Sequence, residues 1–427
     1  MTAADKKADE ALYERLRTAC AAGQTSAAMQ CIEDLQARQL RAQYELDKLL
    51  PAVLGFAEQR FRCGQEAMAQ QIATAMADRD QQRVLALLDQ KLEAQYRPLH
   101  DILIDFKASG YDWVLTSYGQ AQLRECQIQL AASQKDGFTK WEEATVEDHV
   151  RQAAYLFALH LGRTRVLDEP DRYRFVLDPC GTGGRMAKSG SLTRPVMFHE
   201  RVPGAHDFTF GRADFPAYCA HCASWNGIAA ADWFGHPQWV FAAWQNPGDP
   251  CGYSIYKDPN DIPEARYREL GLQKPRQLKP STRGAAFSSI ELEELGTLPS
   301  DRLRQVVLAS DWDRAQGLAQ NLAKEYVLMI KGLRLVLEAF AAYNAGLFER
   351  RQREAFGAVT SGPLTAAMDV AADVDARHQA LLGMTRRFLT RVVDYLGTAF
   401  GQEAVSQCYA QLGTSTLGRA ASEILQG

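Results

Sequence analysis

Apolar residues recur at three- and four-residue spacing along two long segments of the chain, residues 5–134 and 300–427. Alanine, leucine, glutamine, arginine and glutamate dominate both segments, and β-branched residues are few there. This spacing places the apolar side chains on one face of a helix, and these residue types favour helix. Both segments are therefore predicted to fold as successive amphipathic helices.

The pattern changes between these two segments. Residues 171–260 are rich in glycine, proline, histidine and aromatic residues, and short apolar stretches alternate with turn residues. Short apolar stretches bounded by turn residues are typical of β-strands. The strands are expected at residues 173–177, 207–210, 239–241 and 253–256.

These patterns predict a mainly α protein in which two related helical blocks flank a small Cys-rich α+β insert that binds a metal. The N-terminal helical block takes residues 1–145 and the metal-binding domain residues 146–272. A linker rich in proline and basic residues follows at 273–299. The C-terminal helical block takes residues 300–427.

The two helical blocks are predicted to be copies of each other. Residues 112–126 align without a gap to residues 394–408, and five of the fifteen positions are identical. The same offset places Tyr44 on Tyr326. Chance similarity between alanine-rich amphipathic helices is the alternative, because helical periodicity alone matches many apolar positions.

Charge and length narrow the function classes. The 427 residues carry 52 acidic and 48 basic side chains, which is not the basic excess of a protein that binds phosphate backbones. No nucleic-acid partner is therefore expected. The charged N-terminus lacks the apolar stretch of a secretion signal, and no apolar run approaches the length of a bilayer span. A cytoplasmic protein without a membrane partner is expected.

The cysteines carry the first chemical signal. Nine are present, and in a chain expected to stay reduced, clustered thiols indicate metal binding or catalysis before disulfides. The tetrapeptide Asp-Pro-Cys-Gly occurs twice, at residues 178–181 and 249–252, and a Cys-Ala-His-Cys stretch lies between the copies at residues 219–222. Proline before the cysteine and glycine after it suit a turn whose backbone N–H groups point at a thiolate.

The clustered thiols are predicted to bind one metal ion, with the ligands Cys180, Cys219, Cys222 and Cys251. Four thiolates in a tetrahedron suit zinc, and iron or an iron–sulfur cluster is the alternative cofactor. A histidine in place of one cysteine is a second arrangement, which would leave that thiol as a nucleophile or redox group. The alternative without a metal is that these are small buried residues of a loop-rich domain.

A glycine-rich turn follows the first of these cysteines. Residues 175–185, Phe-Val-Leu-Asp-Pro-Cys-Gly-Thr-Gly-Gly-Arg, have the outline of a strand and a turn whose backbone N–H groups can approach an anion. Seven basic and three acidic residues fall within residues 172–212. An anionic part of the substrate is therefore predicted to bind at Gly181, Gly183, Gly184 and Arg185. A solvated basic face is the alternative.

This turn also resembles the first motif of S-adenosylmethionine-dependent DNA methyltransferases, where a strand ends in Asp-Pro and a Gly-rich turn. The resemblance covers about ten residues and implies a doubly wound parallel sheet. The glycines here are out of register with that family's turn, and Asn246-Pro247-Gly248 lacks the aromatic residue of its Asn-Pro-Pro-Tyr motif. A methyltransferase is therefore the third function considered.

Two functions fit the sequence better. In the first, the protein is a metal-dependent enzyme acting on a small polar, anionic molecule, and His221 or His199 moves protons. In the second, a structural zinc site supports a scaffold or binding protein. The enzyme is favoured because glycine amides, an arginine and histidines beside the thiols exceed what a structural site needs. The substrate and the reaction do not follow from the sequence, and a homo-oligomer is left open.

Overall fold

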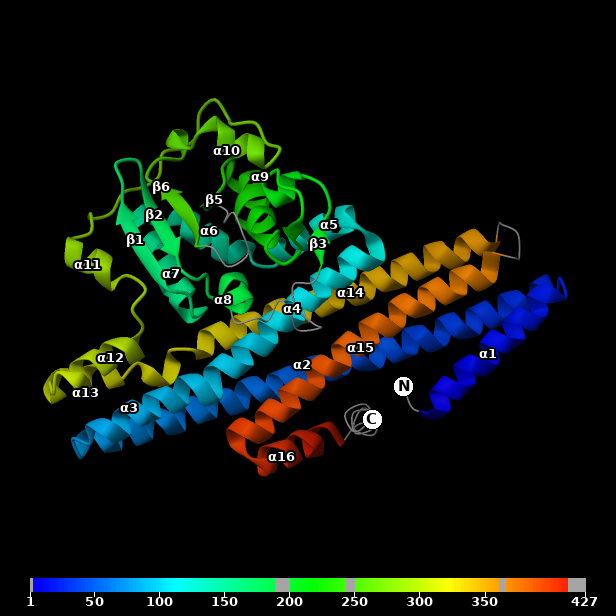
Figure 1. Cartoon of the computed structure of the whole chain (residues 1–427), viewed down its shortest axis with the longest axis horizontal. Helices are drawn as coiled ribbons and strands as arrows, with labels where there is room; N and C mark the ends of the chain where they lie inside the picture. Colours follow the sequence, from blue (N-terminus) through cyan, green and yellow to red (C-terminus); the bar gives the residue numbers. More distant parts are fainter. Residues whose placement is uncertain (1–2, 189–199, 243–249, 361–365, 414–427) are drawn as a thin grey trace. The chain divides into compact units, whose positions relative to one another are not determined.

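The computed structural model describes residues 3–188, 200–242, 250–360 and 366–413 (Figure 1). Contacts divide the chain into two compact units. We call Met1–Arg60 with Leu337–Gly427 the terminal unit, and Phe61–Val336 the central unit. Residues 61–145, which the sequence analysis grouped with the N-terminal helical block, pack within the central unit.

The terminal unit is built from helices. They are α1 (Ala3–Ala21), the first part of α2 (Thr25–Ala77), the second part of α14 (Val327–Thr360), α15 (Ala366–Phe400) and α16 (Gln402–Gly413). Gln39 of α2 connects this helix to α14 and α15 through its amide group. Its oxygen accepts a hydrogen bond from Gln352 at 2.6 Å, and its nitrogen donates to Asp375 at 3.3 Å.

Helices also make up most of the central unit, and two of their segments are π-helical, η1 (Lys91–Tyr96) and η4 (Ala223–Ala229). The α-helices that lie wholly within this unit are α3 (Gln81–Gln90), α4 (Arg97–Tyr118), α5 (Gln120–Ala132), α6 (Lys135–Glu143), α7 (Val146–Leu159), α8 (Gly183–Lys188), α9 (Ala230–Phe234), α10 (Glu264–Glu269), α11 (Ser289–Glu294), α12 (Pro299–Leu308) and α13 (Trp312–Ala319). In the described part of the chain, no helix combines the length and the apolar character that crossing a membrane requires.

The main sheet of the central unit has four antiparallel strands in the order β1-β2-β6-β5. The strands are β1 (Thr164–Asp168), β2 (Arg172–Leu177), β5 (Val240–Ala242) and β6 (Cys251–Tyr256), and a two-stranded sheet pairs β3 (Arg201–Val202) with β4 (Phe215–Pro216). Helix α7 packs on one face of the main sheet (Figure 1). Phe157 of α7 lies against Tyr253 of β6, with 4.7 Å between ring centroids.

The structure confirms a mainly helical protein with a small antiparallel sheet. Three of the predicted strands form within two residues of their expected ends, but the strand predicted at 207–210 is wrong. Asp207–Thr209 instead forms a 3₁₀ turn, in which an Asp207 carboxylate oxygen accepts from the backbone N–H of Phe208 at 2.8 Å. Aspartate competes with extended backbone through such local hydrogen bonds. The antiparallel order also differs from the parallel sheet that the methyltransferase resemblance implies.

The two segments that align in sequence adopt the same local conformation. In each, a helix ends at a glycine with positive φ, +85° at Gly119 and +84° at Gly401, and the next helix begins at the following glutamine. Equivalent ring pairs meet edge to face in both segments, namely Trp113–Tyr118 and Tyr395–Phe400. The duplication of whole blocks stays a prediction.

A buried ion pair holds the helical part of the central unit together. Lys91 Nζ lies 2.6 Å from Glu325 Oε2, and neither side chain is exposed to solvent. Glu325 also accepts from the backbone N–H and the hydroxyl of Ser300, at 2.8 and 2.7 Å. Burial lowers the pKa of Lys91, and the neighbouring carboxylate of Glu325 opposes that change.

We predict that Glu325→Gln lowers the free energy of unfolding by about 3–5 kcal/mol, because it leaves the Lys91 ammonium buried without its counter-charge. The control is Asp89→Asn, which breaks the solvent-exposed pair between Asp89 and Arg304 and should cost about 1 kcal/mol or less. Urea unfolding measures both variants. Equal losses would contradict a structural role for the buried pair.

Candidate functional site

The two Asp-Pro-Cys-Gly turns lie at the same end of the main sheet. The first follows β2, the second leads into β6, and the antiparallel register places Leu177 directly opposite Cys251. Gly252 faces the neighbouring strand closely, since a Cβ there would lie 2.7 Å from the Phe175 carbonyl oxygen. Asp249 lies outside the described residues, as do residues 246–248 of the resemblance. Pairing of the two strands thus brings Cys180 and Cys251 to one edge.

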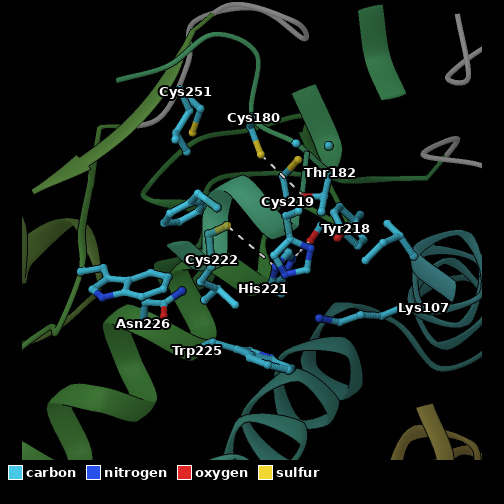
Figure 2. A pocket seen from close by; sticks show the side chains of 18 of the residues that line it. Lys107, Cys180, Thr182, Tyr218, Cys219, His221, Cys222, Trp225, Asn226 and Cys251 are labelled. Carbon is cyan, nitrogen blue, oxygen red and sulfur yellow. Dashed lines mark hydrogen bonds between the residues drawn. The ribbon is translucent and has the colours of Figure 1, made fainter. Parts of the chain in front are cut away.

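The other two cysteines reach this edge from the turn before η4. Cys219 packs on the first turn of α8, where a Cβ on Gly183 would lie 3.0 Å from its sulfur. A Cβ added at Gly184, the next residue, would lie 3.2 Å from the Cβ of Cys180. Figure 2 shows the Cys180 and Cys219 side chains pointing toward each other, with Cys222 and Cys251 nearby.

None of the four cysteines forms a disulfide, and all four line one cavity of about 410 Å³ in the central unit. Its wall is mostly apolar, with aromatic side chains that include Trp141, Phe157, Tyr218, Trp225, Trp239 and Phe241. Polar side chains on the wall include Lys107, His160, Thr182, His221 and Asn226. The site is therefore a cavity with an apolar body and a thiol-rich, basic end (Figure 2).

The prediction that Cys180, Cys219, Cys222 and Cys251 form a metal site is wrong. Among the residues that the structure describes, no group of three or more His, Cys, Asp or Glu side chains is arranged to hold a metal ion. The four thiols instead line one cavity. Cys180 Sγ lies 3.6 Å from the Thr182 hydroxyl, and Cys222 Sγ lies 4.0 Å from Nε2 of His221.

Electrostatics also favour thiols over thiolates at rest. Burial raises the pKa of Cys219 well above its usual value, and the charges of Cys180 and Cys251 add to this effect. The pKa of Cys222 is raised in the same way, and only the nearby Lys107 opposes the change. Reactivity at this site therefore needs a base that takes the proton as sulfur reacts.

His221 has the geometry of such a base. Its Nδ1 donates to the backbone carbonyl oxygen of Tyr218, so in the neutral ring Nε2 carries the lone pair. This Nε2 is the atom 4.0 Å from Cys222 Sγ. Burial, followed by the charge of Lys107, lowers the pKa of His221 well below its usual value. The neutral imidazole is thus the resting form.

Lys107 of α4 is a functional candidate that the sequence analysis missed. Its Nζ lies 4.0 Å from the centroid of the Trp225 ring, and within the described residues it forms no ion pair with a carboxylate. Burial lowers the pKa of Lys107 to about 8, although Cys222 and Cys126 oppose the change. The ammonium is charged at neutral pH but titrates within two units of it.

The predicted anion-binding residues are placed as follows. Gly181, Gly183 and Gly184 line the cavity, but Arg185 points its guanidinium at Asp101, with one contact at 2.9 Å, and its Nε at the Gly181 carbonyl oxygen. Gly181 also has a packing reason, because a Cβ there would lie 1.9 Å from the His160 carbonyl oxygen. Anion binding by these residues stays a prediction. His199, the second predicted proton carrier, lies outside the described residues.

Comparison of the chain with protein-family models, with curated proteins and with solved structures finds no match. The function must therefore be inferred from the cavity itself.

We predict that Gly181→Ala lowers the free energy of unfolding by about 1–3 kcal/mol or more, because the added methyl group collides with the backbone at His160. Gly137→Ala is the matched control. Gly137 lies inside α6 with no atom near the new Cβ, so this change should be neutral or stabilise by up to about 1 kcal/mol. Urea unfolding compares the two, and an unaffected Gly181→Ala variant would show that the turn is not packed as described.

Proposed function

We propose that this protein is an enzyme that uses the Cys222 thiol as a nucleophile on a small acyl compound held in the cavity. The observation that carries the proposal is the Nε2 lone pair of His221, which faces the Cys222 sulfur at 4.0 Å inside an apolar cavity. A nucleophile, a base and a group that orients the base are the usual parts of covalent catalysis. Here the orienting group is the Tyr218 carbonyl.

The reaction balances with these groups alone. His221 Nε2 takes the proton of the Cys222 thiol while sulfur forms a bond to the acyl carbon. The bond from that carbon to the leaving group then breaks, and the leaving group receives the proton from His221. Water hydrolyses the resulting thioester, which returns the thiol. A protonated thiol and a neutral imidazole, the forms that burial favours here, are the correct starting states for this step.

The lining of the cavity defines the substrate class. Aromatic side chains such as Trp141, Trp239 and Phe241 favour an apolar, preferably aromatic body. The Lys107 ammonium lies beside His221 and Cys222 and suits a carboxylate or the oxygen of the acyl group, on which negative charge develops. We therefore place the expected anionic group at one end of the substrate. The rest of the substrate is proposed to be apolar, not polar.

The helical blocks have a supporting role in this proposal. We infer that they arose by duplication, which the shared helix–glycine–helix conformation at Gly119 and Gly401 supports. One copy lies next to the cavity, since α4 carries Lys107 and α5 packs against η4. A binding protein that holds a ligand without reacting is the alternative function.

We predict that aromatic esters such as 4-nitrophenyl phenylacetate acylate Cys222. Cys222→Ser should reduce the release of nitrophenolate to the uncatalysed rate, and His221→Gln should lower it about 10²–10⁴-fold. Cys63→Ser is the control, because Cys63 is exposed and does not line the cavity. Peptide mapping by mass spectrometry locates the adduct. Binding of the ester without acylation would favour the binding protein, and an adduct on another cysteine would refute the assignment.

A second prediction concerns pH. The pKa of Lys107 is lowered to about 8, so its positive charge is present below that pH and is lost above it. The affinity for phenylacetate should therefore fall about tenfold or more between pH 6.5 and pH 9.5, since the carboxylate stays ionised over this range.

Isothermal titration calorimetry measures this affinity. Lys107→Met should bind phenylacetate weakly at both pH values. Lys135→Met, which removes an exposed lysine that lies over Trp233, should behave like the unmodified protein. An unchanged pH dependence in Lys107→Met would contradict the role given to Lys107.

A further inference from the structure

A chain of hydrogen bonds runs from Arg185 to a second histidine of the cavity. Arg185 Nη1 donates to Asp101 at 2.9 Å, and Nδ1 of His100 lies 2.9 Å from the same carboxylate. Nε2 of His100 lies 3.0 Å from Nδ1 of His160. The His100 side chain is fully buried, whereas His160 lines the cavity.

The carboxylate at one end determines where the protons lie. An ionised carboxylate only accepts hydrogen bonds, so Nδ1 of His100 must donate to Asp101. In a neutral His100 ring, Nε2 is then the acceptor, and it receives the proton on Nδ1 of His160. The remaining nitrogen, Nε2 of His160, is left with its lone pair on the side of the ring away from His100.

Charges around the chain keep it in this state. Burial alone would raise the pKa of Asp101, but hydrogen bonds from His100 and Arg185 outweigh burial and lower it to about 2. Burial lowers the pKa of His160 well below its usual value, and the charges of His100, Lys107, His221 and Arg185 act in the same direction. Both imidazoles are therefore neutral at rest.

Two elements fix the position of His160. It caps the C-terminal end of α7, and the Tyr96 hydroxyl donates to the carbonyl oxygen of the preceding residue, Leu159. On the other side its carbonyl oxygen contacts Gly181, next to Cys180. The ring is thus held beside the thiol-rich end of the cavity, near Lys107 and His221.

We propose that His160 is a second catalytic base, which activates the water that hydrolyses the thioester, and that His100, Asp101 and Arg185 are positioning residues acting through it. The proposal rests on the proposed function for the thioester itself. In this step Nε2 of His160 takes a proton from water while the water oxygen bonds to the acyl carbon. The carbon–sulfur bond breaks with its electron pair on sulfur, and the proton of His160 then returns through water to the Cys222 thiolate.

The chemistry divides between the two histidines for a physical reason. Nε2 of His221 faces the Cys222 sulfur, so it serves the step that forms the thioester. Within the described residues His160 makes no hydrogen bond with that sulfur. It belongs to a separate hydrogen-bond chain, in which a carboxylate stabilises the imidazolium that forms. In a Ser-His-Asp triad the carboxylate orients the catalytic histidine directly. Here the Asp101 carboxylate would orient His160 through a second histidine, His100.

The kinetic test uses 4-nitrophenyl phenylacetate and intact-protein mass spectrometry. His160→Gln should still be acylated at Cys222 in a rapid burst but should hydrolyse the thioester about 10²–10⁴-fold more slowly, so that the acylated protein accumulates. Asp101→Asn should show the same pattern, because it removes the carboxylate that determines the tautomers. Fast turnover of the acylated protein in His160→Gln would overturn the proposal.

A second test needs no substrate. Diethylpyrocarbonate modifies unprotonated imidazole nitrogens, so it should label His160 and should label it at least tenfold less in Asp101→Asn. His149 is the matched control, because its Nε2 accepts a hydrogen bond from Trp239 Nε1 at 2.8 Å and should stay unlabelled.

The two tests separate the two proposals. If neither the unmodified protein nor any variant forms an acyl adduct, the proposed thiol chemistry fails. The labelling of His160 still decides the inference in that case. If His160 stays unlabelled while the protein is folded, the exposed lone pair does not exist and the inference is overturned.

Discussion

The pairing of β2 with β6 is the constraint on which the site depends. These strands are 74 residues apart at Leu177 and Cys251, yet the antiparallel register places those two residues opposite each other. Cys180 follows β2 and Cys251 begins β6 at this end, so one set of backbone hydrogen bonds brings two distant cysteines together. The turn before η4 then adds Cys219 and Cys222, and the Cys219 sulfur packs against Gly183 of α8.

Burial determines what this assembly can do. An apolar wall penalises every charged form, so the thiols of Cys219 and Cys222 stay protonated and the rings of His160 and His221 stay neutral. Lys107 is affected in the same direction but keeps a pKa of about 8. The outcome is a site with neutral bases beside neutral nucleophiles and one cation, which suits proton transfer during the reaction more than a preformed ion pair.

Part of this was predictable from the sequence. The pattern of short apolar stretches between turn residues predicted three of the four strands of the main sheet. Such stretches between prolines and glycines are too short for most helices and therefore favour strands. The cysteine spacing drew attention to four residues that line one cavity. The metal prediction was wrong, because in the described part of the chain no group of three or more His, Cys, Asp or Glu side chains could hold an ion.

Other features had little or no signal in the sequence. His100 and His160 lie 60 residues apart and meet because the C-terminal end of α7 reaches α4 at this point. Nothing in the sequence distinguishes Lys107 from the other lysines of the helical segments. The one available signal was its seven-residue spacing from His100, which places both residues on one helix face. Arg185 was predicted to bind an anion of the substrate, because the sequence does not show that its guanidinium already pairs with the Asp101 carboxylate.

The central claim, that the four distant thiols line one cavity, is tested most directly by a short bifunctional thiol reagent. Dibromobimane becomes fluorescent when it links two neighbouring cysteines, and mass spectrometry of peptides identifies the linked pair. The account predicts links drawn from Cys180, Cys219, Cys222 and Cys251, including at least one that joins Cys180 or Cys251 to the Cys219–Cys222 turn. Links confined to Cys219 with Cys222, or links that involve the helical cysteines instead, would contradict it.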